Sequence, residues 1–245
     1  MAAIIVLFTD FGLEGPYIGQ VKTVLHQIAP GVPVVDLFAD LPAAKPQPAA
    51  YLLAAYGRWF PQGTIVLAVV DPGVGGDRAA VVVEADSRWY VGPDNGLLEL
   101  VTRRADHARS WEISAPPEAI SASFHGRDLF APVAGLLARG GPPAGRLRPA
   151  QILRRPEWPD DLPEIAYVDR FGNAMTGLRA ALLPGRARLA AGGRVLARRR
   201  TFSDVAAGEA FWYENSNGLA EIAVNSGRAD AALGLAVGSP VEILP

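Results

Sequence analysis

The sequence contains no cysteine and only three histidines. Without cysteine the chain has no disulfide, no thiolate nucleophile and no Cys-ligated zinc or iron–sulfur centre. No histidine pair or carboxylate–histidine pair has the spacing that is typical of metal ligands. The formal net charge of -2 gives no reason to expect nucleic acid as a partner. We therefore predict no bound metal, no redox cofactor and no nucleic-acid partner.

The chain also lacks the long apolar run that a membrane span or a secretion signal needs. The apolar start has no basic segment before it and reaches Asp10 after a few residues. No stretch approaches the roughly 20 apolar residues of a transmembrane helix. Of the 245 residues, 50% are hydrophobic and 20% are charged, which is typical of folded domains. We expect a soluble cytoplasmic protein that does not bind membranes.

Apolar runs alternate with helical patterns over residues 1–145. Short runs rich in β-branched residues predict strands at 3–8, 32–37, 64–70 and 79–85. Apolar residues at helical spacing predict helices within 16–31, 48–60 and 128–140. This alternation is typical of an α/β domain whose mostly parallel sheet is covered by helices on both faces.

The composition changes near residue 140. Residues 146–162 are rich in Pro and Arg and have no clear period, so we expect a linker there. Short strand-like segments with frequent turns then follow over residues 163–245. Their spacing predicts a smaller C-terminal domain, an antiparallel barrel or sandwich.

Four acidic residues follow predicted strands or lie in turns: Asp10, Asp71, Asp94 and Asp128. Ligands of open α/β sheets bind at the carboxyl ends of the strands, but Asp before Gly or Pro also simply makes turns. We favour the turn for Asp94. Asp10 could accept hydrogen bonds from both hydroxyls of a ribose. The glycines at 73–76 do not form a dinucleotide-binding fingerprint, so we predict no nicotinamide cofactor.

A second pattern joins Asp71, Arg78 and His125. A glycine-rich loop separates Asp71 from Arg78 and could bring them together, and the arginine would keep the carboxylate ionised. His125 precedes a predicted helix, and the three side chains could hold and deprotonate one water. The alternative interpretation is a structural salt bridge and an unrelated loop histidine.

Side-chain amides and hydroxyls gather near aromatic residues in the C-terminal half. The segments 169–176 and 214–227 carry Asn, Ser, Asp and Gly beside Phe171, Phe202 and Trp212. Turn chemistry explains part of this composition. It also fits a pocket that stacks and hydrogen-bonds a heteroaromatic ring.

Taken in order, six motifs resemble one known family. They are FTDFG (8–12), VVDPGVGGDR (69–78), GPDNGLL (92–98), FHGRDLFAP (124–132), DRFGN (169–173) and NSNGLAEIAVNSG (215–227). They cover nearly the whole chain and resemble the S-adenosyl-L-methionine (SAM) hydrolases that form adenosine, also called SAM hydroxide adenosyltransferases. Fluorinases and chlorinases are relatives of that family.

The resemblance implies hydrolysis of SAM to adenosine and L-methionine without a cofactor. It implies an α/β N-terminal domain, a C-terminal β-barrel and a homotrimer whose active sites lie between subunits. The family's water-binding triad falls on Asp71, Arg78 and His125, and Gly126 would keep the space beside the histidine open.

The resemblance also implies the substrate contacts. Asp10 would bind the ribose diol, Asn173 the nucleoside, and Phe202 would stack on adenine. Asp169 and Ser216 would bind the amine and carboxylate end of methionine. The full predicted substrate-binding set is Asp10, Phe11, Asp169, Phe171, Asn173, Phe202, Ser216 and Asn217.

Departures from the halogenases leave alternatives open. Fluorinases have serine, tyrosine and threonine where this chain has Gly126, Asp71 and Val74, whereas the chlorinase also has glycine at position 126. Asn217 stands where halogenases have arginine. The alternatives are a chlorinase-like halogenase and a non-catalytic protein that binds adenosine or SAM. A third is a hydrolase with Mg²⁺ on Asp10, Asp71 and Asp94.

Overall fold

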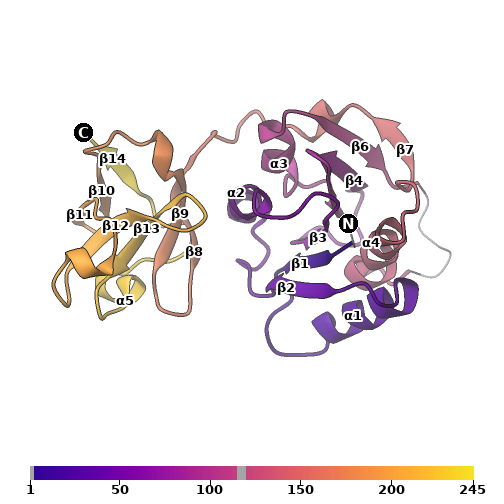
Figure 1. Cartoon of the computed structure of the whole chain (residues 1–245), viewed down its shortest axis with the longest axis horizontal. Coiled ribbons are helices and arrows are strands. Elements are labelled where there is room, and N and C mark those ends of the chain that lie inside the picture. Colours follow the sequence, from indigo (N-terminus) through magenta and orange to yellow (C-terminus); the bar gives the residue numbers. More distant parts are fainter. Residues whose placement is uncertain (1–2, 115–119) are drawn as a thin grey trace. The chain divides into compact units, whose positions relative to one another are not determined.

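The computed structural model describes residues 3–114 and 120–245, which form two compact units (Figure 1). The first unit comprises Met1–Arg155 and the second Pro156–Pro245. Each unit has its own buried core. No helix in the described ranges is long and apolar enough to cross a bilayer.

A seven-stranded sheet organises the first unit, in the order β2-β1-β3-β5-β4-β6-β7. The strands are β1 (Ile5–Thr9), β2 (Val34–Phe38), β3 (Ile65–Val69), β4 (Ala80–Ala85), β5 (Arg88–Pro93), β6 (Ala108–Glu112) and β7 (Arg146–Arg148). Neighbours from β2 to β5 pair in parallel, and β4 is antiparallel to both β5 and β6. Five strands therefore share one direction, and β4 and β7 run against them.

Helices cover both faces of this sheet, with α1 and α4 on one and α2 and α3 on the other (Figure 1). Their bounds are α1 (Tyr17–Ile28), α2 (Pro46–Gly57), α3 (Glu99–Arg104) and α4 (Ala131–Ala138), which follows the π-helical turn η1 (Gly126–Phe130). Val21 and Leu25 of α1 and Phe130 of η1 are fully buried against strand residues such as Leu7 and Leu67. The apolar residues that recur at helical spacing in the sequence thus face the core, as predicted.

The sheet contains antiparallel strands that the sequence pattern did not predict. Strand β5 follows β4 through a tight turn in which Asp86 and Ser87 both adopt positive φ. Such a hairpin turn usually carries Asn-Gly, so its sequence gave no signal. The expected linker at 146–162 also begins with ordered structure, because Arg146–Arg148 pairs with β6 and a 3₁₀ turn, η2, spans Ala150–Leu153.

The second unit contains two antiparallel sheets that share one core. The four-stranded sheet, in the order β12-β13-β9-β8, comprises β8 (Leu162–Val168), β9 (Ala174–Arg179), β12 (Ala210–Glu214) and β13 (Leu219–Val224). The three-stranded sheet, in the order β11-β10-β14, comprises β10 (Arg188–Ala191), β11 (Arg194–Ala197) and β14 (Glu242–Leu244). The short helix α5 spans Ala229–Leu233, and single 3₁₀ turns span Ala180–Leu182 (η3) and Phe202–Asp204 (η4). Trp212 and Ile222 from one sheet and Leu189 from the other are fully buried in this core.

Candidate active site

Asp71, Arg78 and His125 lie together at the carboxyl end of β3. Nε of Arg78 donates to both carboxylate oxygens of Asp71 at 3.0 Å, and Nη2 also donates to Oδ2. Nη2 of Arg78 lies 2.8 Å from Nδ1 of His125. The side chains are nearly buried, with 4% of Asp71 and 12% of Arg78 exposed. The structure therefore brings together the three residues that the sequence singled out.

The loop geometry explains how residues 47 positions apart in sequence meet. Gly75 has a φ of +79°, and a Cβ there would lie 2.4 Å from the carbonyl oxygen of Ala122. Only glycine lets the loop after β3 approach the segment before His125 so closely. The guanidinium of Arg78 also lies over the ring of Phe130, 5.3 Å from its centroid.

The contact with Arg78 fixes the tautomer of His125. A guanidinium has no acceptor, so Nδ1 must accept the hydrogen bond and a neutral ring carries its proton on Nε2. Burial and the nearby Arg78 charge lower the pKa of His125, which keeps the imidazole neutral near pH 7. His125 is thus a hydrogen-bond donor at Nε2, and Nδ1 is not available to take a proton from water.

A pocket of about 160 Å³ opens beside this cluster. Its walls are Asp10, Phe11, Ala44, Val69, Asp71, Pro72, Val74, Ser123, Phe124, His125 and Gly126. Asp10 follows β1 and Asp71 follows β3, and these neighbouring parallel strands end at the same edge of the sheet. That edge is where open α/β sheets bind ligands.

Asp10 is a partly satisfied acceptor at this edge. Its Oδ2 accepts a hydrogen bond from the backbone N–H of Ala44 at 2.9 Å. Burial raises the pKa of Asp10, the Ala44 hydrogen bond lowers it, and the negative charge of Asp71 adds a smaller upward effect. The other carboxylate oxygen has no hydrogen bond to another residue in the described ranges, so it can accept one from a ligand.

Aromatic rings form one wall of the pocket. Phe11 packs edge-on to Phe124, with ring centroids 5.6 Å apart, and Tyr17 packs on Phe124 at 5.3 Å. A Cβ on Gly126 would lie 2.7 Å from Cζ of Phe11 and 3.2 Å from Phe124. Gly126 therefore keeps room for the two rings, in addition to the space beside His125.

Arg127 and Asp128, which follow Gly126 in sequence, stabilise the local backbone. Arg127 donates to both carboxylate oxygens of Asp128 at 2.5 and 2.9 Å, and Asp128 also accepts from the N–H of Ser121 at 2.9 Å. These bonds anchor the segment that carries Ser123 and Phe124. Sequence reasoning gave no role to Ser123, Phe124 or Ala44. The first two adjoin His125 in sequence, whereas only the fold brings Ala44 to the pocket.

Asp94 does not join Asp10 and Asp71. Its carboxylate pairs with Arg148 and, at 3.0 Å, with Arg155. Within the described ranges no group of three His, Asp or Glu side chains is arranged to hold a metal ion. Two of the three carboxylates of the magnesium alternative, Asp71 and Asp94, are thus paired with arginines.

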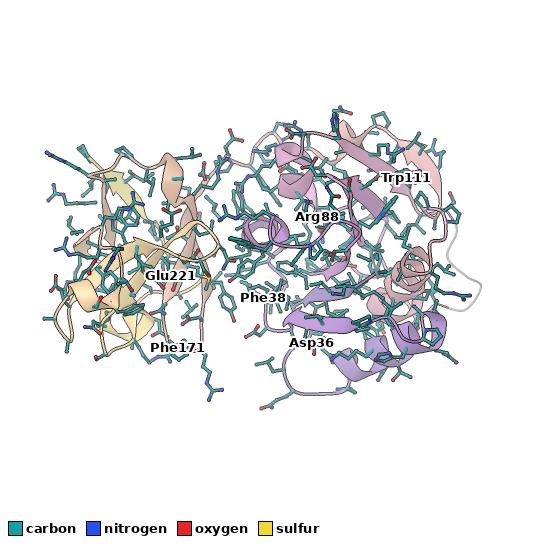
Figure 2. All side chains as sticks on the ribbon, in the orientation of Figure 1. Asp36, Phe38, Arg88, Trp111, Phe171 and Glu221 are labelled. Atoms are coloured by element: carbon teal, nitrogen blue, oxygen red, sulfur yellow. The ribbon has the colours of Figure 1, made fainter. Side chains whose placement is uncertain are left out.

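In the second unit, Asp169 and Asn173 hold the turn between β8 and β9. Asp169 accepts from the backbone and the side-chain amide of Asn173 at 2.9 and 3.2 Å. Between them, Phe171 is 74% exposed, at the periphery of the unit (Figure 2). The side-chain oxygen of Asn173 makes no hydrogen bond in the described ranges, which leaves an acceptor for a ligand.

Ser216 and Asn217 lie in the turn between β12 and β13, at the other end of the β9–β13 pair. Oδ1 of Asn215 accepts from the N–H groups of Asn217 and Leu219, at 2.9 and 3.0 Å. Nδ2 of Asn215 donates to Glu221 at 2.8 Å. Asn215 and the buried Glu221 (Figure 2) therefore shape this turn, and sequence reasoning assigned neither a role.

Phe202, the predicted adenine partner, lies in η4 within an aromatic cluster. Its ring centroid is 5.2 Å from that of Phe211 and 5.4 Å from that of Tyr213. Phe211 and Tyr213 come from β12, so the sheet supports the ring of Phe202 from behind. The ring remains partly exposed.

Sequence comparison identifies both halves of the chain. Residues 5–146 match the SAM hydroxide adenosyltransferase N-terminal domain, and residues 163–242 match the C-terminal domain of the same family. The chain belongs to the SAM hydroxide adenosyltransferase family. The sequence is 45% identical to an (R)-S-adenosyl-L-methionine hydrolase of Thermus thermophilus, covering 96% of this chain and 97% of that one.

More distant similarities define the limits of this family relationship. A fluorinase of Nocardia brasiliensis is 25% identical over 71% of each chain. The crystal structure of an uncharacterized conserved protein from Thermotoga maritima matches 99% of this chain and 100% of that chain, with a TM-score of 0.88 and 30% identity. The SAM hydroxide adenosyltransferase fold thus extends over both units, and the halogenases are more remote.

Proposed function

We propose that this protein hydrolyses S-adenosyl-L-methionine to adenosine and L-methionine. The main support is the buried Asp71–Arg78–His125 cluster, whose Asp71 and His125 line a pocket together with Asp10. The 45% identity to a protein named as an (R)-S-adenosyl-L-methionine hydrolase points to the same reaction. The family relationship supports the substrate class, and the cluster supports the site that we propose for the water.

The reaction would be an in-line displacement at C5′ of the ribose. The water oxygen forms the new bond to C5′ while the C5′–sulfonium bond breaks, and its electron pair leaves with sulfur as neutral methionine. The water loses one proton to solvent. Because a thioether is a neutral leaving group, no general acid is needed.

The cluster would act by stabilising a hydroxide-like nucleophile. The Nε2–H of His125 would donate to a bound oxygen, and the positive charge of the neighbouring Arg78 would favour negative charge there. In this assignment His125 orients the oxygen and does not remove its proton, which revises the general-base role expected from the sequence. Asp71 holds Arg78 in place through two-oxygen contact.

The remaining roles rest on the resemblance. Asp10 and Phe11 would bind the ribose side, and Asp169, Phe171, Asn173, Phe202, Ser216 and Asn217 would complete the substrate contacts. We also propose closure of the second unit's sheets into a barrel, a cytoplasmic location and a homotrimer whose active sites lie between subunits. The pocket of about 160 Å³ is smaller than the roughly 300–1,000 Å³ of typical ligand sites, which is consistent with further walls.

The alternatives are separated by one experiment. Purified protein would be incubated with SAM and a chelator, with and without chloride or fluoride, and the products separated by chromatography. Adenosine and methionine appearing in equal amounts, whatever the halide, would support hydrolysis. A 5′-halogenated nucleoside would select the halogenase, and intact bound SAM would select a binding protein. Activity lost with chelator and restored by magnesium would contradict the metal-free mechanism.

A further inference from the structure

A second pocket lies at the opposite edge of the first unit's sheet. It has a volume of about 250 Å³ and is lined by Ala54, Gly57, Arg58, Ala85, Asp86, Arg88, Tyr90, Val101, Arg104 and Ala105. These residues come from α2, the β4–β5 hairpin and α3. Arg88 begins β5 beside the start of β3, whereas Asp71 follows the end of β3. A strand length, roughly 17–20 Å, therefore separates this pocket from the Asp71 cluster.

The lining of this pocket is positively charged. It contains three arginines, Arg58, Arg88 and Arg104, and one carboxylate, Asp86, which gives the lining a formal charge of +2. Within the described ranges, neither Arg58 nor Arg88 forms an ion pair with a carboxylate. The carboxylate of Asp86 instead accepts a hydrogen bond from the N–H of His107 at 3.1 Å.

Backbone contacts hold Arg88 in position without neutralising it. Nε donates to the carbonyl oxygen of Phe60 at 2.7 Å, and Nη1 donates to the carbonyl oxygen of Asp86 at 3.2 Å. Arg88, labelled in Figure 2, is the first residue of β5. Both of these partners are uncharged carbonyl oxygens, and Nη2 has no hydrogen bond in the described part of the chain.

Tyr90 adds a donor without a protein partner. Its side chain lines the pocket and the residue is only 3% exposed, yet its hydroxyl makes no hydrogen bond to any residue the structure describes. A Cβ at Gly57 would lie 3.0 Å from this hydroxyl, so glycine leaves room for it. Burial raises the pKa of Tyr90 to about 12, which keeps the hydroxyl protonated. The hydroxyl of Tyr90 is therefore a donor that a ligand in the pocket could use.

We propose that this pocket binds a phosphate group, either inorganic phosphate or the phosphate of a small monoester. Arg58 and Arg88 would neutralise its charge and the hydroxyl of Tyr90 would donate to one of its oxygens. Arginine suits a tetrahedral oxyanion because its planar fork offers two parallel donors. The volume of about 250 Å³ has room for a phosphate carrying a short organic group.

Isothermal titration calorimetry of the full chain would test the site, with inorganic phosphate as the probe and chloride matched in ionic strength as the blank. We expect binding to one site per chain. Arg58→Gln and Tyr90→Phe should each weaken it roughly tenfold or more, because each removes a hydrogen bond to a charged group. The Tyr90→Phe variant should fold normally, since the deleted hydroxyl makes no hydrogen bond within residues 3–114 and 120–245.

The matched control is Arg146→Gln, which removes an arginine whose side chain is 77% exposed outside the pocket. Its phosphate affinity should equal that of the wild type. A second arm replaces phosphate with glycerol 3-phosphate, and tighter binding would identify the monoester as the ligand. Phosphate binding no stronger than the chloride blank, or unchanged in both pocket variants, would overturn the proposal.

Discussion

Nη2 of Arg78 donates a hydrogen bond to Nδ1 of His125 over 2.8 Å, and the same guanidinium also donates to the carboxylate of Asp71. The arginine thus lies between an acid and a histidine. Because a guanidinium has only donors, the neutral histidine must carry its proton on Nε2. The imidazole can therefore donate a hydrogen bond from Nε2–H. This arrangement differs from a Ser-His-Asp triad, in which the carboxylate itself contacts the ring and prepares it to take a proton.

The donor role of His125 predicts different outcomes for two substitutions. His125→Ala should lower kcat about 100- to 1,000-fold with little change in KM, as loss of an oxyanion donor does in other enzymes. His125→Gln, whose amide can supply an N–H near the position of Nε2, should retain more activity than the alanine variant. Steady-state SAM hydrolysis measures both. His26→Gln on the exposed face of α1 is the control. Equal losses in the two variants would instead indicate proton removal by the ring.

The pH dependence of kcat tests the same contact. Burial and Arg78 lower the pKa of His125 below its usual 6.5. Protonation would put a second positive charge beside Arg78 and remove the acceptor at Nδ1. Since the folded-state pKa is depressed, we expect kcat to stay level from about pH 8 down through pH 6.5 and to fall only in more acid solution. An acid limb centred at or above pH 6.5 would contradict this assignment.

Asp10 should determine affinity and have little effect on the chemical step. Asp10→Asn removes the charge that would strengthen hydrogen bonds to the ribose, so adenosine should bind roughly tenfold more weakly while kcat changes little. Calorimetry with adenosine and steady-state kinetics with SAM measure the two effects. The exposed Asp106→Asn is the matched control. Wild-type adenosine affinity in Asp10→Asn would exclude the ribose contact.

Gly126→Ser probes the difference from the fluorinases. Its Cβ would meet the ring of Phe11 at 2.7 Å, and such overpacking costs about 1–3 kcal/mol. We expect slower hydrolysis and no 5′-fluorinated product, because Asp71 and Val74 are unchanged. Product chromatography with fluoride checks both points, and halogenation by this single variant would show that the pocket wall already suits a halide.

Glu221 should control the stability of the second unit. The carboxylate accepts hydrogen bonds from Tyr213 and Asn215 at 2.5 and 2.8 Å, and burial raises its pKa above 4.5. A raised carboxyl pKa adds stability below pH 4.5, and that contribution is lost as the pH rises through the folded-state pKa. Between about pH 4.5 and 8, the unfolding temperature should therefore fall less steeply with rising pH in Glu221→Gln than in the wild type.

The alanine variant at the same position should behave differently. Glu221→Ala removes the acceptor that Glu221 supplies to Nδ2 of the buried Asn215, at a cost of about 2 kcal/mol or more. Since Asn215 holds the turn that carries Ser216 and Asn217, KM for SAM should also rise. Unfolding temperatures equal to those of Glu221→Gln would show that the two hydrogen bonds do not stabilise the turn.

Much of the fold follows from local pattern. β-Branched runs predicted β1 to β4, and helical spacing predicted α1, α2 and α4, because each periodicity places apolar side chains on the buried face. The β5 strand could not be found this way, since its turn uses Asp86 and Ser87 instead of a recognisable hairpin sequence. Strand β7 was hidden in an Arg- and Pro-rich stretch whose order comes from pairing with β6.

The candidate site, like the fold, was only partly predictable from the sequence. Asp71 and Arg78 are separated by one glycine-rich loop, so the sequence by itself determined that they could pair. Folding alone decided that His125, far along the chain, faces Arg78 with Nδ1, because a tautomer depends on the partner that the ring meets in space. Tertiary structure likewise decided that Asp94 is paired with arginines and that Tyr90 and Arg88 line the same pocket. Sequence fixes which groups are available, and packing decides which hydrogen bonds they make.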